Sequence, residues 1–186
     1  MLFYLSLIET DEERDLFTDL YNEYRQPMLL YAYTILKNQQ DAEDVVHDVF
    51  CIVADSYIKK LLTDSAASRK HFLLVCTKNR SITLAKRRSK TVSFDELSEI
   101  GYTFPSEAEE IKIIDDEADK EMVEKAKSAL LGLDHLYSDV LWLSFKGFTA
   151  SDIAKLFNEK SETIKKRIYR GKLMLRDAVG MKGGEI

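Results

Sequence analysis

The spacing of hydrophobic residues predicts helices in the first half of the chain. Over residues 13–36, apolar side chains recur every three or four positions, as on one helix face, and Pro27 predicts a kink or a join between two helices. A second helix is expected after the polar turn 37–40, with Asp41 as its cap and an apolar stripe from Ala42 to Tyr57. A third is expected over residues 69–86, where the apolar side is formed by Phe72, Val75, Cys76 and Ile82.

The second half separates into a stretch without periodicity and a series of shorter helices. Residues 89–119 show no sustained pattern before Ser106, so we expect a linker, and helices are predicted over 121–131 and 136–145. Thr149 and Asp152 have the spacing of a capping box, which predicts a helix over 150–157. After the short turn 158–160, Ser161 is expected to cap a final helix, 162–179. A short helix, a tight turn and a longer basic helix form the helix-turn-helix pattern.

Composition supports a helical fold and excludes several classes of site. The 186 residues include only 7 glycines and 2 prolines, and the first glycine is Gly101, so a large sheet is not expected in the first half. These glycines form neither a dinucleotide-binding fingerprint nor a phosphate-binding loop. We therefore predict an all-α chain, with two small helical domains at residues 9–90 and 120–180 joined by an acidic linker at 91–119.

The cysteines and histidines give no signature of a disulfide or a metal site. Cys51 and Cys76 lie in apolar stretches without a C-x-x-C pair, and the 3 histidines lack metal-binding spacing. A reducing cytoplasm fits these cysteines best, and we expect no cofactor. The apolar opening segment 1–8 is too short to span a bilayer and lacks the basic start of a signal peptide, so no membrane insertion is expected.

Charge is distributed in blocks, which the net charge of -5 conceals. Residues 9–55 hold 12 acidic and 3 basic residues, 69–90 hold 8 basic and no acidic ones, 91–121 hold 11 acidic and 2 basic ones, and 159–176 hold 7 basic and 2 acidic ones. Two basic blocks predict two contacts with a polyanion. The alternative is that they are solvated helix faces, and the acidic linker either separates two modules or screens their basic patches.

The last helix carries the residue types that read DNA in the major groove. Such a helix enters the groove by its N-terminal end, where Lys, Arg and Thr side chains reach bases, while later basic residues reach phosphates. The candidate contacts to upstream DNA are Thr163, Lys165, Lys166, Arg167, Arg170 and Lys172.

Three stretches in this order resemble bacterial RNA polymerase sigma factors of the extracytoplasmic-function (ECF) type. L-Y-N-E-Y-R at 20–25 with D-A-E-D-V-V-H-D-V-F at 41–50 is similar to region two of the family. F-L-L-V-C-T-K-N at 72–79 with K-R-R at 86–88 resembles the end of that region. G-F-T-A-S-D-I-A at 147–154 with E-T-I-K-K-R-I-Y-R-G-K at 162–172 is similar to region four. The departures from the family pattern are Phe72 for Trp, Tyr137 for Pro, Asp152 for Glu, Asn158 for Gly and Glu159 for an apolar residue.

The resemblance implies a transcription-initiation factor without catalytic activity. Such a protein binds core RNA polymerase and the minus-ten promoter element through region two, and reads the minus-thirty-five element through region four. The implied polymerase-binding residues are Asp41, Glu43, Asp44, His47 and Asp48. The implied minus-ten contacts are Lys78, Asn79, Arg80, Lys86, Arg87 and Arg88. The free protein is expected to be a monomer, and whether an anti-sigma factor binds it is left open.

Other interpretations stay open at this point. The acidic stripe is also consistent with a solvated face, His47 with an inert surface residue, and Asn79 with a structural hydrogen-bonding role. A helix-turn-helix regulator that binds DNA unaided leaves the D-A-E-D helix and the central basic block unexplained. A metal-dependent nuclease would use the acidic helix face, but no motif supplies its remaining ligands. The promoter sequence and the inducing signal are not encoded in these patterns.

Overall fold

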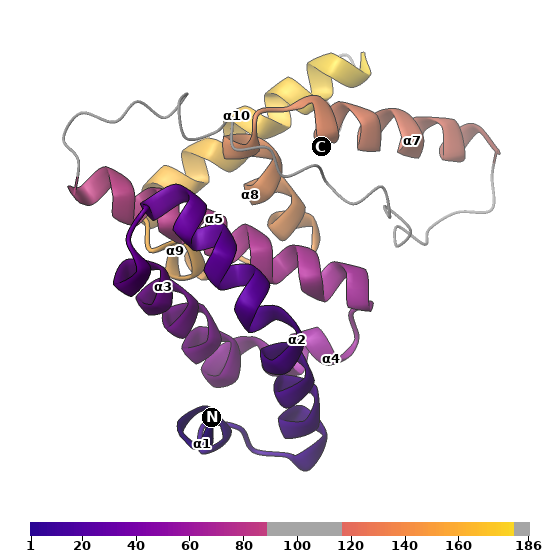
Figure 1. Ribbon diagram of the computed structural model, residues 1–186. Helices are drawn as coiled ribbons and strands as arrows, with labels where there is room; N and C mark the ends of the chain where they lie inside the picture. Colours follow the sequence, from indigo (N-terminus) through magenta and orange to yellow (C-terminus); the bar gives the residue numbers. More distant parts are fainter. Residues whose placement is uncertain (89–116, 181–186) are drawn as a thin grey trace. The chain divides into compact units, whose positions relative to one another are not determined.

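The described part of the chain is helical. The computed structural model describes residues 1–88 and 117–180, and within these two ranges it contains helices and no strand (Figure 1). The prediction of an all-α fold is confirmed for these residues. The chain divides into two compact units, of which the first contains residues 1–88 with Leu156–Asn158, and the second contains the remaining described residues. The predicted acidic linker, 91–119, lies outside the described residues as far as position 116.

The first unit opens with a short helix and a long one. Helix α1 spans Leu2–Leu5, and α2 spans Asp11–Leu36 after Thr10, whose hydroxyl accepts a hydrogen bond from the Glu13 N–H at 3.3 Å. Helix α2 continues through Pro27 as one helix, so the alternative of a join between two helices was wrong, and the kink stays a prediction. The positions that flank the proline on the buried face, Tyr24 and Met28, are both in the core. Packing of this face therefore maintains a helix that local propensity would interrupt.

The second helical segment changes its winding partway along. Helix α3 spans Gln39–Ile52, continues through a π-helical turn at Val53–Tyr57, and ends in α4 at Ile58–Leu62. Its cap is Asn38, whose side chain accepts a hydrogen bond from the Asp41 N–H at 3.0 Å. The prediction of Asp41 as the cap was wrong, because Asn caps a helix as well as Asp does and stands three residues earlier.

The core of the first unit forms where α2 and α3 pack against α5, which spans Ala66–Arg88. Residues 71–83 of α5 are all buried. Beside them, four aromatic rings from α1, α2 and α3 meet with centroid distances of 5.0 to 6.3 Å, and they belong to Tyr4, Phe17, Tyr21 and Phe50. These contacts combine a large buried apolar area with favourable ring geometry, so they fix α1 and α3 against α2.

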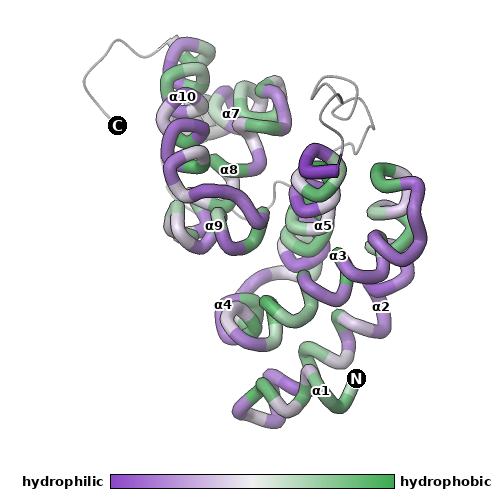
Figure 2. The backbone as a smooth tube through the Cα atoms, turned by 90° about the vertical axis from the view of Figure 1, so that its left-hand side faces the viewer, coloured by the Kyte–Doolittle hydropathy of each residue, from purple (hydrophilic) through white to green (hydrophobic). Residues whose placement is uncertain are grey.

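The second unit contains the helix pair that was predicted from the sequence. Its helices are α7 at Glu117–Gly132, α8 at His135–Phe145, α9 at Ala150–Phe157, of which the last two residues group with the first unit, and α10 at Ser161–Val179. Helix α10 packs against α7 and α8, and Figure 2 shows hydrophilic and hydrophobic positions alternating along it. Its inward side includes Ile164 and Gly171, both buried.

A capping box at the start of α9 and a left-handed residue in the turn before α10 shape this helix pair. The Asp152 N–H donates to the Thr149 hydroxyl at 3.2 Å and the Thr149 N–H donates to the Asp152 carboxylate at 2.8 Å, so the predicted capping box is confirmed. Asn158 has φ 55°, a left-handed conformation that Asn tolerates, as expected for the turn. The prediction that Ser161 caps α10 was wrong, because Lys160 precedes the helix and no side chain caps it.

No helix among residues 1–88 and 117–180 combines the length and the apolar character needed to cross a membrane.

Candidate functional site

Helix α3 exposes most of the residues that were predicted to bind polymerase. Its buried side is formed by Ala42, Val45, Val46, Val49 and Phe50. Glu43, Asp44, His47 and Asp48 are exposed on the opposite side. Positions i, i+1, i+4 and i+5 share one side of a helix, so the four side chains form a continuous polar face. The fifth predicted residue, Asp41, is buried and does not belong to this face.

Asp41 connects the start of α3 to the end of α5. Its side chain is 7% exposed, and its carboxylate is paired with the Arg88 guanidinium, which is 58% exposed. A buried carboxylate needs such a partner, because desolvation of an unpaired charge is costly. The structure therefore brings together one residue predicted for polymerase and one predicted for DNA.

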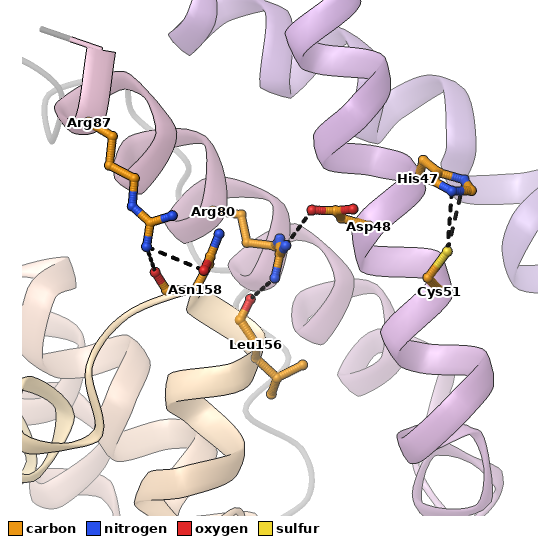
Figure 3. Close-up of polar contacts among 7 residues, drawn as sticks. All are labelled: His47, Asp48, Cys51, Arg80, Arg87, Leu156 and Asn158. Atoms are coloured by element: carbon orange, nitrogen blue, oxygen red, sulfur yellow. Dashed lines mark hydrogen bonds and ion pairs between the residues drawn. The ribbon is translucent and has the colours of Figure 1, made fainter.

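A second ion pair links the same two helices nearer their centres. The Arg80 guanidinium donates to the Asp48 carboxylate, as Figure 3 shows. The Arg80 side chain is only 9% exposed, whereas that of Asp48 is 52% exposed. One carboxylate of the polar face thus compensates the charge of a buried arginine and joins α3 to α5.

His47 lies between side chains from two elements. The Tyr4 hydroxyl is 2.6 Å from His47 Nδ1, and the Cys51 sulfur is 3.4 Å from Nε2 (Figure 3). Burial is the main cause that raises the pKa of Tyr4 to about 12, so the phenol stays protonated at neutral pH and can donate to Nδ1. Burial and the nearby Asp48 carboxylate raise the pKa of the Cys51 thiol, which is half-buried. The role of Tyr4 was missed, because nothing in the opening segment distinguishes it from its apolar neighbours.

The residues predicted to contact the minus-ten element are divided along α5. Lys78, Asn79 and Arg80 are buried, whereas Lys86 is half-buried and the last two arginines of the helix are exposed. The Asn79 amide donates to the Val75 carbonyl at 3.0 Å, which is a contact of the structural kind considered for this residue. Among these six residues, the exposed positive charge is therefore found at the C-terminal end of the helix.

The outward side of α10 carries a compact set of cations. Lys165, Lys166 and Arg170 are exposed, whereas Thr163, Arg167 and Lys172 are half-buried. Lys165 Nζ lies 2.9 Å from the Glu162 carboxylate, and this contact lowers the pKa of Glu162. The same side includes Tyr169, 66% exposed, which sequence reasoning passed over although it directly precedes Arg170.

Arg167 has a different environment from its neighbours on α10. Its side chain is 15% exposed, and its guanidinium lies 3.8 Å from the carboxylate of Glu159, which is 23% exposed. Burial lowers the pKa of Arg167, and the Glu159 carboxylate opposes this shift. The acidic residue at position 159 departs from the family pattern. It lies in the turn before α10 and has Arg167 of that helix as a partner.

Comparisons with known proteins assign no family to the chain. No family model matches it, and no curated sequence matches it at a significant level. In the described ranges, no group of three or more histidine, cysteine or acidic side chains is arranged to bind a metal ion. The functional argument therefore depends on the surfaces of α3, α5 and α10 themselves.

Proposed function

We propose that this protein is a sigma factor of the ECF type, which binds core RNA polymerase, recognises promoter DNA and directs transcription initiation. The observation that carries the proposal is the helix pair α9–α10. A capped first helix is followed by a left-handed turn at Asn158 and then by a helix whose exposed side presents Lys165, Lys166 and Arg170. A helix of this kind fits the major groove and offers cations to both base edges and phosphates.

The acidic face of α3 supports the polymerase part of the proposal. Glu43 and Asp44 are exposed and have no lysine or arginine at the i+3 or i+4 position of the helix. An acidic surface repels phosphates, so a regulator that acts on DNA alone leaves this face unexplained. A basic surface on core polymerase would be complementary to it, and such complementarity steers association.

Transcription with purified core polymerase tests this function. The template is a library with randomised promoter elements, and RNA start sites are read by sequencing with and without the protein. We expect defined start sites only when the protein is added, and loss of both RNA and polymerase binding for Asp44→Lys. Asp19→Lys, a charge reversal at an exposed position of α2, is the matched control and should retain activity. Failure of the wild-type protein to bind core polymerase would overturn the proposal.

Binding to duplex DNA in the absence of polymerase distinguishes the alternative regulator. The net charge of -5 predicts weak binding of the free protein at physiological salt. Tight, sequence-specific binding by the protein alone in a gel shift would favour a regulator that acts unaided.

A further inference from the structure

A thiol and an imidazole meet on the outer side of α3. Cys51 follows His47 by four residues, so the two side chains lie one turn apart on the same side of the helix, and Figure 3 shows them pointing toward each other. The Cys51 sulfur is 3.4 Å from His47 Nε2 and 4.0 Å from Nδ1. His47 is exposed and Cys51 is half-buried, so a solute in the surrounding water can reach both side chains.

Tyr4 holds the imidazole at its second nitrogen. The Tyr4 side chain is buried, and its hydroxyl is 2.6 Å from His47 Nδ1. Because this phenol donates to Nδ1 at neutral pH, the neutral imidazole carries its proton on Nε2, the nitrogen nearer to the Cys51 sulfur. A histidine that binds a metal through one nitrogen usually has a polar partner at the other, which fixes the orientation of the ring. Tyr4 provides that partner.

We propose that Cys51 and His47 together bind a thiophilic divalent cation such as Zn²⁺, through the Cys51 sulfur and His47 Nε2. The thiol releases its proton to solvent when the metal–sulfur bond forms. The imidazole proton moves from Nε2 to Nδ1, where the Tyr4 hydroxyl oxygen accepts it, so one proton is released for each ion bound. This site is independent of the proposed function.

The distance between the two ligand atoms fits such an ion. Tetrahedral zinc, with sulfur at about 2.3 Å and nitrogen at about 2.0 Å, separates the two ligand atoms by about 3.5 Å. The distance in the protein is 3.4 Å. Because the sulfur is also close to Nδ1, it stands against the ring rather than in line with Nε2. Binding therefore requires a rotation of one of the two side chains, which their exposure permits. Histidine pairs in helical zinc sites have the same four-residue spacing.

The surroundings of the pair favour a cation. Asp44, three residues before His47, is exposed on the same side of α3. Burial and then the nearby Asp48 carboxylate raise the pKa of the Cys51 thiol, and the Arg80 guanidinium opposes this shift. A raised pKa disfavours the free thiolate that oxidation requires, whereas a metal ion displaces the proton directly. Thiolate and imidazole ligands select zinc-like ions over Mg²⁺ and Ca²⁺, which prefer oxygen ligands.

The number of ligands predicts an exchangeable ion. Structural zinc sites use four protein ligands, whereas Cys51 and His47 leave two positions of a tetrahedral ion to water. We therefore expect the ion to exchange with solvent and to respond to the metal concentration rather than to maintain the fold. A bound ion adds positive charge to the polar face of α3, so its occupancy changes the charge that this face presents.

Cobalt absorption of the reduced full-length protein tests the site, because a Co²⁺–thiolate bond has a charge-transfer band in the near ultraviolet. We expect this band in the wild type, and its loss when Zn²⁺ displaces Co²⁺. Cys51→Ser should abolish the band, and His47→Gln should raise the Kd for Zn²⁺ at least about tenfold. Cys76→Ala removes the other, buried thiol and is the matched control, which should retain the band and the affinity. Circular dichroism verifies that each variant folds.

Two further variants distinguish ligands from residues that only maintain packing. Tyr4→Phe should raise the Kd for Zn²⁺ about tenfold and keep the cobalt–thiolate band at saturation, because the ligands remain while their orientation is lost. Cys51→His should bind Zn²⁺ without the band. The proposal is overturned if the wild type shows no band, if Cys51→Ser and His47→Gln bind Zn²⁺ like the wild type, or if an equal concentration of Mg²⁺ displaces the zinc.

Discussion

Two adjacent basic residues on α10 should behave differently when each is replaced by alanine. Lys166 is exposed, whereas Arg167 is 15% exposed and lies 3.8 Å from Glu159. Both positions lie in the N-terminal half of the helix, where a side chain can reach base edges. The environments therefore predict that Lys166→Ala changes DNA recognition, and that Arg167→Ala changes mainly the stability of the second unit.

The expected magnitudes follow from these environments. One good base contact is worth about 1–3 kcal/mol of discrimination, roughly a 5- to 150-fold change in preference for one base pair. Loss of Arg167 removes the cation that lies 3.8 Å from the half-buried Glu159 carboxylate, which should lower the free energy of unfolding by about 1 kcal/mol. We expect Arg167→Ala to shift promoter preference less than about twofold.

Promoter selection and unfolding are measured on the same variants. Polymerase holoenzyme selects templates from a randomised upstream element, and urea unfolding of the second unit is followed by the fluorescence of Trp142, the single tryptophan of the chain. Lys125→Ala, a neutralised exposed lysine on α7, is the matched control. The reasoning would be refuted if Arg167→Ala shifts base preference as much as Lys166→Ala, or if neither variant differs from the control.

Three further predictions concern packing and pairing. Gly171→Ala should lower the stability of the second unit, because the new methyl group meets the buried Leu141 side chain at 3.0 Å and an overpacking cost of about 1–3 kcal/mol exceeds the gain of about 1 kcal/mol in helix propensity. Gly132→Ala, in open space, should not lower it, and both variants are read by tryptophan fluorescence. Because the pKa of Tyr4 is raised to about 12 in the folded protein, its contribution is fully present below pH 10 and is lost as the pH rises through 12. Tyr4→Phe should therefore flatten this part of the stability profile in alkaline unfolding by circular dichroism. Arg88→Ala should cost about 1–3 kcal/mol in urea unfolding by leaving the buried Asp41 carboxylate unpaired, and the second substitution Asp41→Asn should recover part of the loss.

Helix periodicity was predictable because burial of one face decides where these helices form. The stripe from Ala42 to Phe50 and the capping box at Thr149 are both found in the structure. The residues at which the helices begin were less predictable. Whether Asn38 or Asp41 caps α3 depends on which side chain reaches a free N–H, and both are competent residues three positions apart.

Two features of the first unit show tertiary packing overriding local preference. Helix α2 passes through Pro27, with Tyr24 and Met28 buried on either side. The segment after Ile52 inserts a π-helical turn, yet Val53 and Tyr57 remain buried. Neither outcome is visible in the sequence, because each depends on residues that are distant along the chain and contribute to the same core.

The candidate surfaces show the same limit for charge. The sequence places an acidic block in the first helices and a basic block near residue 80, and it suggests one partner for each. In the folded unit Asp48 pairs with Arg80 and Asp41 with Arg88, across 32 and 47 positions of sequence. Part of each block is therefore neutralised by the other. The charge that remains for partners is smaller and more local: Glu43 and Asp44 on α3, Arg87 at the end of α5, and the lysines and Arg170 on the outer side of α10. Mutations at these exposed positions should report on partners, whereas mutations of the paired residues should report first on the fold.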